Sequence, residues 1–464
     1  MAIEITVKNF GPLKEAKVQL APLTVFVGPN NTGKSYLATL IYAAMKARPS
    51  PAVVASRPVS ADAADRFFLL AEHLAEGGGA HSEVHSSLKD VVARRSRNWF
   101  ESLGRSFRSE LERSFGANFV ELAGGSSAAA VSIAGGSWSL RAHASAVTAS
   151  CGVLRASTES LVLGAAARAR HAGTSQDPAG RRVAVVRLIA EELFRDRPAW
   201  VHYLPASRSG ILQTYRAFAR AILEDAPGLD SEARQVTGTS GTVTDFVGQL
   251  LFTDAARSSP LAEIAAYLES ELLQGTVRLE HANPMLIPEM VFEDRQGRFP
   301  VHRTSSMVSE VAPLVIWLRY SLRPDHLLVI EEPESHLHPA AQATMARAVA
   351  MMVNAGVKVL LTTHSDYFLA EINNLIREGS LPRNGHKPKA RKSAKVVLEH
   401  RLRPEQVAAY AFEKSEGGTV VRDIAVTPLD GIDESEFGRV AEALHGRTVE
   451  LYRGLVEAGV ADAD

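Results

Sequence analysis

The spacing of hydrophobic and polar residues along the chain predicts an α/β protein. Uninterrupted apolar runs predict four buried strands of a central sheet, near residues 25, 202, 328 and 359. Ahead of the first run, alternating residues 3–7 and the turn at 9–12 predict a β-hairpin. Apolar residues recur every three or four positions over most of residues 55–115 and 150–196, which predicts helices.

The order of these elements predicts how the chain is divided. Residues 1–50 supply the first part of a core, residues 197–382 complete it, and residues 51–196 form a mainly helical insertion between them. Residues 383–464 are expected to form a basic linker and a small C-terminal α/β extension. A chain of 464 residues is long enough for a core with an insertion of this size.

The composition narrows the class of protein. The formal net charge of -1 excludes a protein-wide basic field, so any contact with nucleic acid depends on local patches. Cys151 is the only cysteine, which excludes a disulfide framework and a cysteine-based zinc site within one chain. The sequence does not begin with a signal-peptide pattern and has no uncharged apolar run of about 20 residues. We therefore expect a cytoplasmic protein without a membrane partner.

A glycine-rich loop follows the first buried strand. Residues 23–27 are apolar, a helical pattern starts at Tyr36, and between them lies Gly28-Pro29-Asn30-Asn31-Thr32-Gly33-Lys34-Ser35, which fits G-x-x-x-x-G-K-[ST]. In such a loop the backbone N–H groups and the helix N-terminus bind phosphate. Lys34 would reach the β- and γ-phosphates, and the Ser35 hydroxyl would ligate Mg²⁺. We therefore expect residues Gly28 to Tyr36 to bind ATP and Mg²⁺.

A second buried strand, residues 327–330, ends in two carboxylates, Glu331 and Glu332. Acids at the carboxyl end of such a strand emerge beside bound phosphates. Glu331 would hold Mg²⁺, and Glu332 would orient and deprotonate the attacking water. Taken alone, two glutamates in this position are better explained as a solvated strand end. The residues that follow, Pro333-Glu334-Ser335-His336-Leu337-His338-Pro339, favour the catalytic interpretation.

Together these motifs resemble the ABC-type ATPase heads of the RecF, SMC and OLD-like group. The resemblance rests on residues 28–35 and 331–339, and on Asn9-Phe10-Gly11-Pro12-Leu13 and Thr362-Thr363-His364-Ser365. It implies a P-loop NTPase of the ABC-ATPase-head type with an N-terminal β-hairpin and a long, mostly helical insertion. It also implies that Glu332 is the catalytic glutamate, that residues 335–338 form the D-loop, and that His364 is the switch histidine.

Other family features are weaker or absent in this sequence. The metal-binding Asp-x-Asp pair of the Toprim nuclease domain in OLD-like proteins has no counterpart after His364 except the terminal Asp462-Ala463-Asp464, which surface charge explains. We therefore expect no nuclease in this chain. The segment 304–310 stands where the family has a signature loop, and Ser306 would contact the nucleotide of the opposite subunit. Met307 replaces the usual glycine, so either the loop lies further from the phosphate or hydrolysis is slow. An ordinary serine N-cap is an equal alternative to the signature function.

Two further candidates follow the strand near residue 202. Arg208 would neutralise phosphate charge, with a surface salt bridge as the equal alternative. Gln213 is a weak candidate for the metal- and water-contacting glutamine of the Q-loop.

The resemblance implies a homodimer with two nucleotides at its interface, whose nucleotide state controls a separate effector protein, as in bacterial anti-phage systems. The alternatives are a RecF-like DNA-repair ATPase and a nucleotide-clamped scaffold with negligible turnover. DNA is a possible partner through the basic cluster Lys387, Lys389, Arg391, Lys392 and Lys395. The basic helices near residues 94–108 are better explained as a solvated face, because acidic residues are interspersed among them.

Overall fold

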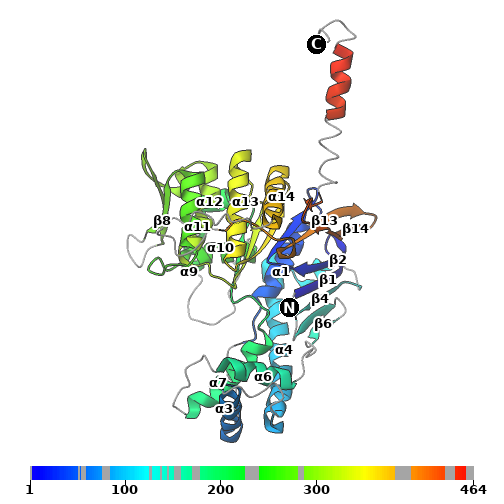
Figure 1. Cartoon of the computed structure of the whole chain (residues 1–464), viewed down its shortest axis with the longest axis vertical. Coiled ribbons are helices and arrows are strands. Elements are labelled where there is room, and N and C mark those ends of the chain that lie inside the picture. The colour runs from blue at the N-terminus through cyan, green and yellow to red at the C-terminus, as the bar shows by residue number, and fades with distance from the viewer. Residues whose placement is uncertain are drawn as a thin grey trace.

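The computed structural model describes residues 3–50, 53, 59–75, 84–124, 128–135, 138–143, 146–150, 158–169, 178–224, 240–280, 287–381, 399–433 and 445–455. An eleven-stranded sheet passes through the body of the molecule, in the order β6-β5-β4-β1-β2-β14-β13-β3-β12-β11-β7. Figure 1 shows helices α10 to α14 gathered on one side of the body, while α3, α6 and α7 project away from it.

The sheet has an antiparallel wing and a parallel centre. The wing pairs the N-terminal hairpin with strands of the insertion: β1 (Ile3–Phe10), β2 (Leu13–Leu20), β4 (Ala130–Ala134), β5 (Ser139–His143) and β6 (Ala146–Ser150). The centre contains five mutually parallel strands: β13 (Val407–Ser415), β3 (Leu23–Val27), β12 (Lys358–Thr363), β11 (Leu327–Glu331) and β7 (Val201–Leu204). Strand β14 (Gly418–Ile424) joins the two parts, antiparallel to β13 and parallel to β2.

The helices divide between the insertion and the core. The insertion contributes α3 (Ala61–Ala75), α4 (Ser86–Phe115), α5 (Phe119–Leu122), α6 (Thr158–Ala169) and α7 (Pro178–Leu193). The core contributes α1 (Lys34–Lys46), α8 (Arg208–Gln213), α9 (Tyr215–Glu224), α10 (Gly241–Leu251), α11 (Ala262–Leu268), η1 (Glu269–Leu273), α12 (Ser306–Tyr320), α13 (Pro339–Asn354) and α14 (Asp366–Ser380).

The remaining elements are short and lie outside the eleven-stranded sheet. They are a three-stranded sheet of β8 (Thr276–Glu280), β9 (Glu289–Asp294) and β10 (Gly297–Pro300), the short helices η2 (Val301–Arg303) and η3 (Pro404–Gln406), and the pair β15 (Val426–Thr427) and β16 (Gly431–Ile432). No helix among the described residues is long and apolar enough to cross a membrane.

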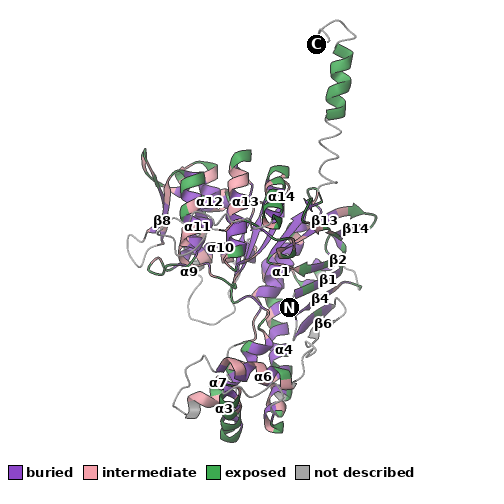
Figure 2. Ribbon diagram, viewed as in Figure 1, coloured by how far each residue is buried: buried purple, intermediate pink, exposed green. Residues whose placement is uncertain are grey.

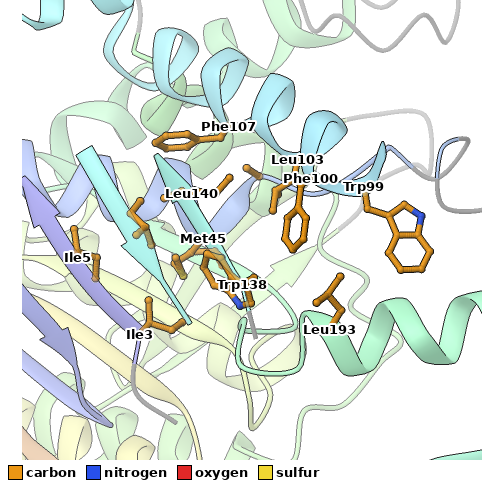
Figure 3. Close-up of a cluster of buried hydrophobic side chains, with 14 of the residues drawn as sticks. Ile3, Ile5, Met45, Trp99, Phe100, Leu103, Phe107, Trp138, Leu140 and Leu193 are labelled. Atoms are coloured by element: carbon orange, nitrogen blue, oxygen red, sulfur yellow. The ribbon is translucent and has the colours of Figure 1, made fainter. Parts of the chain in front are cut away.

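Alternation along each central strand divides the buried side chains into two cores. Val329 and Leu360 face α1 and α4, whereas Leu328 and Leu361 face α10 to α14. Figure 3 shows part of the first core, which includes Phe100 and Phe107 of α4 and Leu140 of β5. Each large apolar side chain buried in this way contributes about 1.5–3 kcal/mol to stability. The insertion and the core therefore share one continuous hydrophobic cluster.

The structure changes the predicted division of the chain at its C-terminal end. Residues 399–433 were expected in a separate extension, but β13 pairs with β3 along residues 407–411 and so belongs to the central sheet. The helix at residues 445–455 is exposed on all sides, as Figure 2 shows. The basic cluster at residues 387–395 and Cys151 lie outside the described residues.

Candidate nucleotide site

The sheet topology brings the three sequence motifs to one edge. Strands β3, β12 and β11 are adjacent and parallel, so their carboxyl ends lie side by side. The loop from Gly28 follows β3, Glu332 follows β11, and His364 follows β12. This is the edge at which parallel α/β sheets bind ligands. Motifs that lie some 300 residues apart in the chain (364 minus 28 is 336) therefore meet in one site.

The loop of residues 28–33 has a backbone that requires its glycines. Gly28 has φ of 137° and Gly33 has φ of 88°, and Gly33 is the N-cap of α1. The Thr32 hydroxyl donates to the Pro29 carbonyl at 2.8 Å and closes the turn. Pro29, Asn30, Asn31 and Ser35 are exposed along the loop. The loop thus presents its backbone and Ser35 outward at a helix N-terminus, the arrangement that binds phosphate.

Substitution of Gly28 by alanine is expected to damage the loop. A Cβ at this position would lie 2.7 Å from the Phe412 carbonyl oxygen on β13, and the positive φ is itself strained for alanine. We expect Gly28→Ala to cost about 1–3 kcal/mol of stability and to weaken nucleotide binding, measured by thermal unfolding and ATP titration. Gly210→Ala is the matched control, because a Cβ there has open space. Equal stability of the two variants would contradict this account.

Lys34 is the buried cation of the loop. Its side chain is 5% exposed, and Nζ donates to the carbonyl oxygens of Gly28 and Pro29 at 2.9 and 2.8 Å. Burial lowers the pKa of Lys34 to about 8, although the nearby charges of Glu332 and Glu334 oppose the shift. The ammonium group is therefore held inside the loop by weak carbonyl acceptors, which phosphate oxygens would replace as stronger partners.

Glu332 and His364 face each other across the site. The Nε2 atom of His364 lies 3.9 Å from Oε1 of Glu332, and Ser335 donates its hydroxyl to Oε2 of Glu332 at 2.9 Å. Glu332 has φ of 45°, and its N–H donates to the Thr362 carbonyl at 3.0 Å. Burial and the charge of Lys34 lower the pKa of His364. At neutral pH the imidazole is accordingly neutral and can donate one ring N–H.

Glu331 is tied to the neighbouring strand β7. Its Oε1 accepts from the Tyr203 hydroxyl at 2.8 Å, and its Oε2 accepts from the Ala206 N–H at 3.1 Å. Tyr203 also contacts the Thr39 hydroxyl of α1 at 3.0 Å. Each carboxylate oxygen keeps a further lone pair, so Glu331 can still hold a metal through water. The sequence did not indicate these partners, because nothing in the pattern marks Tyr203.

Glu334 is a site residue to which the sequence assigned no role. It is 9% exposed, and its Oε1 accepts from the Thr363 hydroxyl and from the His364 N–H, both at 2.8 Å. Its Oε2 has no hydrogen-bond partner among the described residues. Burial raises the pKa of Glu334. The carboxylate fixes the end of β12 and thereby orients His364; its position as the third acid of Glu-Glu-Pro-Glu is the signal that could have identified it.

Arg208 lies beneath the site and does not face its opening. Its guanidinium is 3% exposed and forms an ion pair with Glu310 of α12, with Nε 2.7 Å from Oε2. It also donates to the carbonyl oxygens of Pro205, Glu331 and Glu332 at 3.0, 2.8 and 3.2 Å. These donors are occupied, so neither expected role, phosphate contact or surface salt bridge, describes this arrangement. Arg208 connects the end of β11 to the helix that starts at Ser306.

Removing Arg208 should destabilise the protein strongly. Arg208→Met leaves the Glu310 carboxylate buried without a cation, which costs about 3–5 kcal/mol. We expect the double variant Arg208→Met/Glu310→Met to recover only part of this loss, because the carbonyl oxygens of Glu331 and Glu332 still lack donors. Arg216→Met, which breaks an exposed pair with Glu289, should cost about 0–1 kcal/mol. Thermal unfolding of the four proteins tests the ranking; an Arg208→Met variant as stable as Arg216→Met would refute it.

The remaining candidates lie at the border of this site. The N-cap of α12 is Ser305, whose hydroxyl oxygen accepts from the Val308 N–H at 3.3 Å, and Ser306 is exposed as the first helical residue. Met307 is partly buried against the core. Gln213 lies beside His302, which precedes α12. The Tyr36 hydroxyl donates to the Leu122 carbonyl at 3.1 Å, so its side chain faces the insertion and only its backbone is available to a nucleotide.

The residues at this edge fit a nucleoside triphosphate with a divalent cation. Lys34, the loop amides and His364 would meet phosphate oxygens, and Ser35 with Glu331 would hold Mg²⁺. The unpartnered Oε2 of the buried Glu334 is one observation that favours an additional cationic or hydrogen-donating group in this site.

Comparisons with known proteins agree with this geometry. Residues 1–68 match a family described as "AAA ATPase domain", and residues 253–370 match one described as "AAA domain, putative AbiEii toxin, Type IV TA system". No curated protein matches the sequence. Among solved structures, the chain is similar to an Smc head bound to the C-terminal winged-helix domain of ScpA, with 12% identity over 91% of this chain and 97% of that one and a TM-score of 0.38.

Two further solved structures are similar at the same level. One is the SMC head domain from Thermotoga maritima, with 9% identity over 92% of this chain and 99% of that one and a TM-score of 0.35. The other is the Smc head domain from Pyrococcus furiosus with an extended coiled coil, bound to the C-terminal domain of ScpA. It has 11% identity over 95% of this chain and 98% of that one and a TM-score of 0.36.

The two family matches contain the chemistry of the site. The first includes the loop Gly28 to Ser35, and the second includes Glu331, Glu332 and His364. The sheet joins these segments at one edge. The segments on both sides of the insertion therefore match AAA ATPase families, and together they form one P-loop site at the edge of the sheet.

Proposed function

We propose that this protein hydrolyses ATP and that its nucleotide-dependent dimer state controls a separate effector protein. The observation that carries the proposal is the convergence of Lys34, Glu332 and His364 at one sheet edge, with Glu332 and His364 3.9 Å apart. A buried cation beside an exposed carboxylate and a neutral imidazole supplies the groups that phosphoryl transfer to water requires.

Each residue has a distinct part in this reaction. Lys34 stabilises charge on the β- and γ-phosphates, and His364 donates a hydrogen bond to the γ-phosphate. Glu332 orients the attacking water and accepts its proton, while Ser335 fixes one of the two Glu332 carboxylate oxygens. Mg²⁺, held by Ser35 and by Glu331 through water, would neutralise phosphate charge. Glu334 acts through His364, whose backbone it holds.

The position of Ser306 supports a dimer. It is exposed at the first turn of α12, where helix N–H groups favour an anion, and its helix connects to the catalytic edge through Glu310 and Arg208. We propose that this turn meets the nucleotide bound to the loop of a second copy. Because Met307 replaces glycine and is partly buried, we expect slow turnover, which suits a switch better than a motor.

The proposed biological role is that of the sensor ATPase in a bacterial anti-phage system. The family matched by residues 253–370 carries the description "AAA domain, putative AbiEii toxin, Type IV TA system", which is consistent with a role in defence. In such an arrangement the ATPase responds to a trigger and a partner chain executes the response.

Steady-state ATP hydrolysis by the purified full chain tests the proposal. We expect Mg²⁺-dependent phosphate release that His364→Ala reduces, while His400→Ala, which alters an exposed histidine near Glu378, leaves it unchanged. Co-purification with products of neighbouring genes would identify the effector. ATP binding without any turnover would refute the enzyme proposal and leave a nucleotide-clamped scaffold.

ATP affinity should also depend on pH in a defined direction. Since the pKa of Lys34 is lowered to about 8, this side chain loses its charge above pH 8 unless phosphate is bound. Binding must then include uptake of a proton, so we expect ATP affinity to fall by roughly tenfold per pH unit above 8. Titrations at pH 7, 8 and 9 measure the effect. Lys34→Arg, which stays charged, should show a flat profile, and a flat profile in the parent would contradict the assignment.

A further inference from the structure

A cavity lies at the edge of the sheet opposite the nucleotide site. It has a volume of about 780 Å³, within the range of small-molecule sites. Ala199 precedes β7, Asp325 precedes β11 and Lys358 begins β12, so one wall is formed by the amino ends of the parallel strands. Val183 and Phe194 form the other wall, at helix α7 of the insertion. The cavity therefore lies between the insertion and the ATPase domain.

The lining of this cavity is strongly cationic. Two acids, Glu191 and Asp325, are opposed by six cations: Arg48, Arg168, Arg187, Arg195, Arg197 and Lys358. Arg187 is paired with Glu191 at 2.7 Å, and the neighbouring Glu192 pairs with both Arg168 and Arg195. Counting Glu192, six cations against three carboxylates leave an excess of three positive charges around the cavity. Such a concave surface attracts anions.

Two of these cations, the buried Arg197 and the partly buried Arg48, have backbone carbonyl oxygens as their hydrogen-bond acceptors. Arg197 is 7% exposed, and its Nη2 donates to the carbonyl oxygens of Ala44 and Ala47. Its Nε and Nη1 have no partner among the described residues. Arg48 donates to the carbonyl oxygens of Met45, Ala47 and Pro198. Burial lowers the pKa of both guanidinium groups, and the positive charge of Arg48 lowers the pKa of Arg197 further.

This arrangement is unfavourable in the absence of a negative ligand. A buried guanidinium whose Nε and Nη1 lack acceptors loses the hydration of those donors, and its stacking over the Trp138 ring, 4.7 Å from the ring centroid, offsets only part of that loss. In the described part of the chain, no carboxylate forms an ion pair with Arg48, Arg197 or Lys358. An anion in the cavity would supply the missing acceptors. Arginine forks match the oxygen geometry of a phosphate group.

The apolar part of the lining indicates what accompanies the phosphate. Val183 is 43% exposed, and Phe194 is only partly buried, with its ring edge-on to Phe100. An aromatic ring at the wall of a cationic groove is a stacking surface for a nucleobase. We propose that this cavity binds a nucleoside phosphate, either as a free nucleotide or as the phosphorylated end of a nucleic-acid strand.

The cavity also touches the helix that carries the nucleotide loop. Helix α1 begins at Lys34 and ends at Lys46, and Arg48 and Arg197 occupy its last carbonyl oxygens. Cations at this end of a helix are favourable because the carbonyl groups there carry partial negative charge. The second ligand would therefore bind against the far end of the same helix that starts in the ATP site.

Calorimetric titration of the full chain tests the proposal, with saturating MgADP present to fill the loop site. The probes are dTMP and a thymidine hexanucleotide with a 5′-phosphate. We expect at least one probe to bind, and the double variant Arg195→Gln/Lys358→Gln to weaken that binding by roughly tenfold or more. These two positions lie at the cavity without capping α1. Arg216→Gln/Arg257→Gln, at exposed ion pairs elsewhere, is the matched control and should bind as the parent does.

The probes distinguish the two sources of the ligand. Binding of dTMP as tight as that of the hexanucleotide supports a free nucleotide, and binding of the hexanucleotide alone supports a strand end. The proposal fails if neither probe binds, if the double variant binds as tightly as its control, or if hexaglutamate displaces the bound probe as well as dTMP does. Thermal unfolding of both double variants verifies that each remains folded.

Discussion

Glu332→Gln should reduce steady-state ATP hydrolysis by at least ~100-fold while ATP binding is retained, because a general base contributes about 10²- to 10⁴-fold to such reactions. The amide cannot accept the proton of the attacking water, but its oxygen can still accept the Ser335 hydroxyl that now bonds Oε2 at 2.9 Å. Lys34 and the loop of residues 28–33 are unchanged in this variant. The loss should therefore appear in turnover and leave nucleotide affinity intact.

A second Glu–His pair in the chain provides the control. Glu378 of α14 lies 3.5 Å from Nε2 of His400, and both side chains are about half exposed (47% and 41%). Glu378→Gln makes the same chemical change at a similar contact far from the sheet edge, and we expect normal turnover. Hydrolysis by Glu332→Gln within a few-fold of the parent would show that Glu332 is not the base.

Lys34→Ala should weaken ATP binding by at least ~100-fold. The ammonium group would form hydrogen bonds to two phosphates, each worth about 1.5–3 kcal/mol, and about 1.4 kcal/mol corresponds to a tenfold change in affinity. The unliganded protein should lose little stability, because burial already penalises the charged form and lowers the pKa of Lys34. A large drop in affinity without a drop in melting temperature is therefore the expected signature.

Lys46→Ala separates this effect from a general defect of helix α1. Lys46 lies at the other end of the same helix and pairs with Asp245 at 2.7 Å. We expect it to change stability modestly and leave ATP affinity near that of the parent, measured by titration of both variants with ATP and Mg²⁺. If the two substitutions weakened binding equally, the role of Lys34 as the phosphate-binding cation would have to be abandoned.

The strands that carry the site could be predicted because their signals are local. Residues 23–27, 327–331 and 358–363 are short apolar runs, and the residues that follow them carry recognisable chemistry. Parallel strands buried on both faces produce such runs wherever they occur. The meeting of Gly28, Glu332 and His364 then follows from the shared direction of the strands.

The features that escaped prediction depend on pairings between distant residues. Strand β13 lies beside β3 although nearly the whole chain separates them, and only the folded sheet reveals this. Arg208 was expected to contact phosphate or to form a surface salt bridge, yet it forms a buried pair with Glu310. Glu331 was expected to hold Mg²⁺, but its hydrogen bonds with Tyr203 and Ala206 could not be predicted. Hydrophobic pattern determines which side chains are buried, and it does not specify which polar groups meet there.

We propose that each chain carries half of a composite ATP site. The most direct test is the mass in solution of Glu332→Gln with MgATP, compared with MgADP. The account predicts twice the 50.0 kDa monomer mass with ATP and the monomer mass with ADP. It also predicts that adding Ser306→Arg, a bulky side chain at the exposed first turn of α12, restores the monomer. A mass of 50.0 kDa with bound ATP, or an ATP-dependent dimer that Ser306→Arg leaves intact, would contradict it.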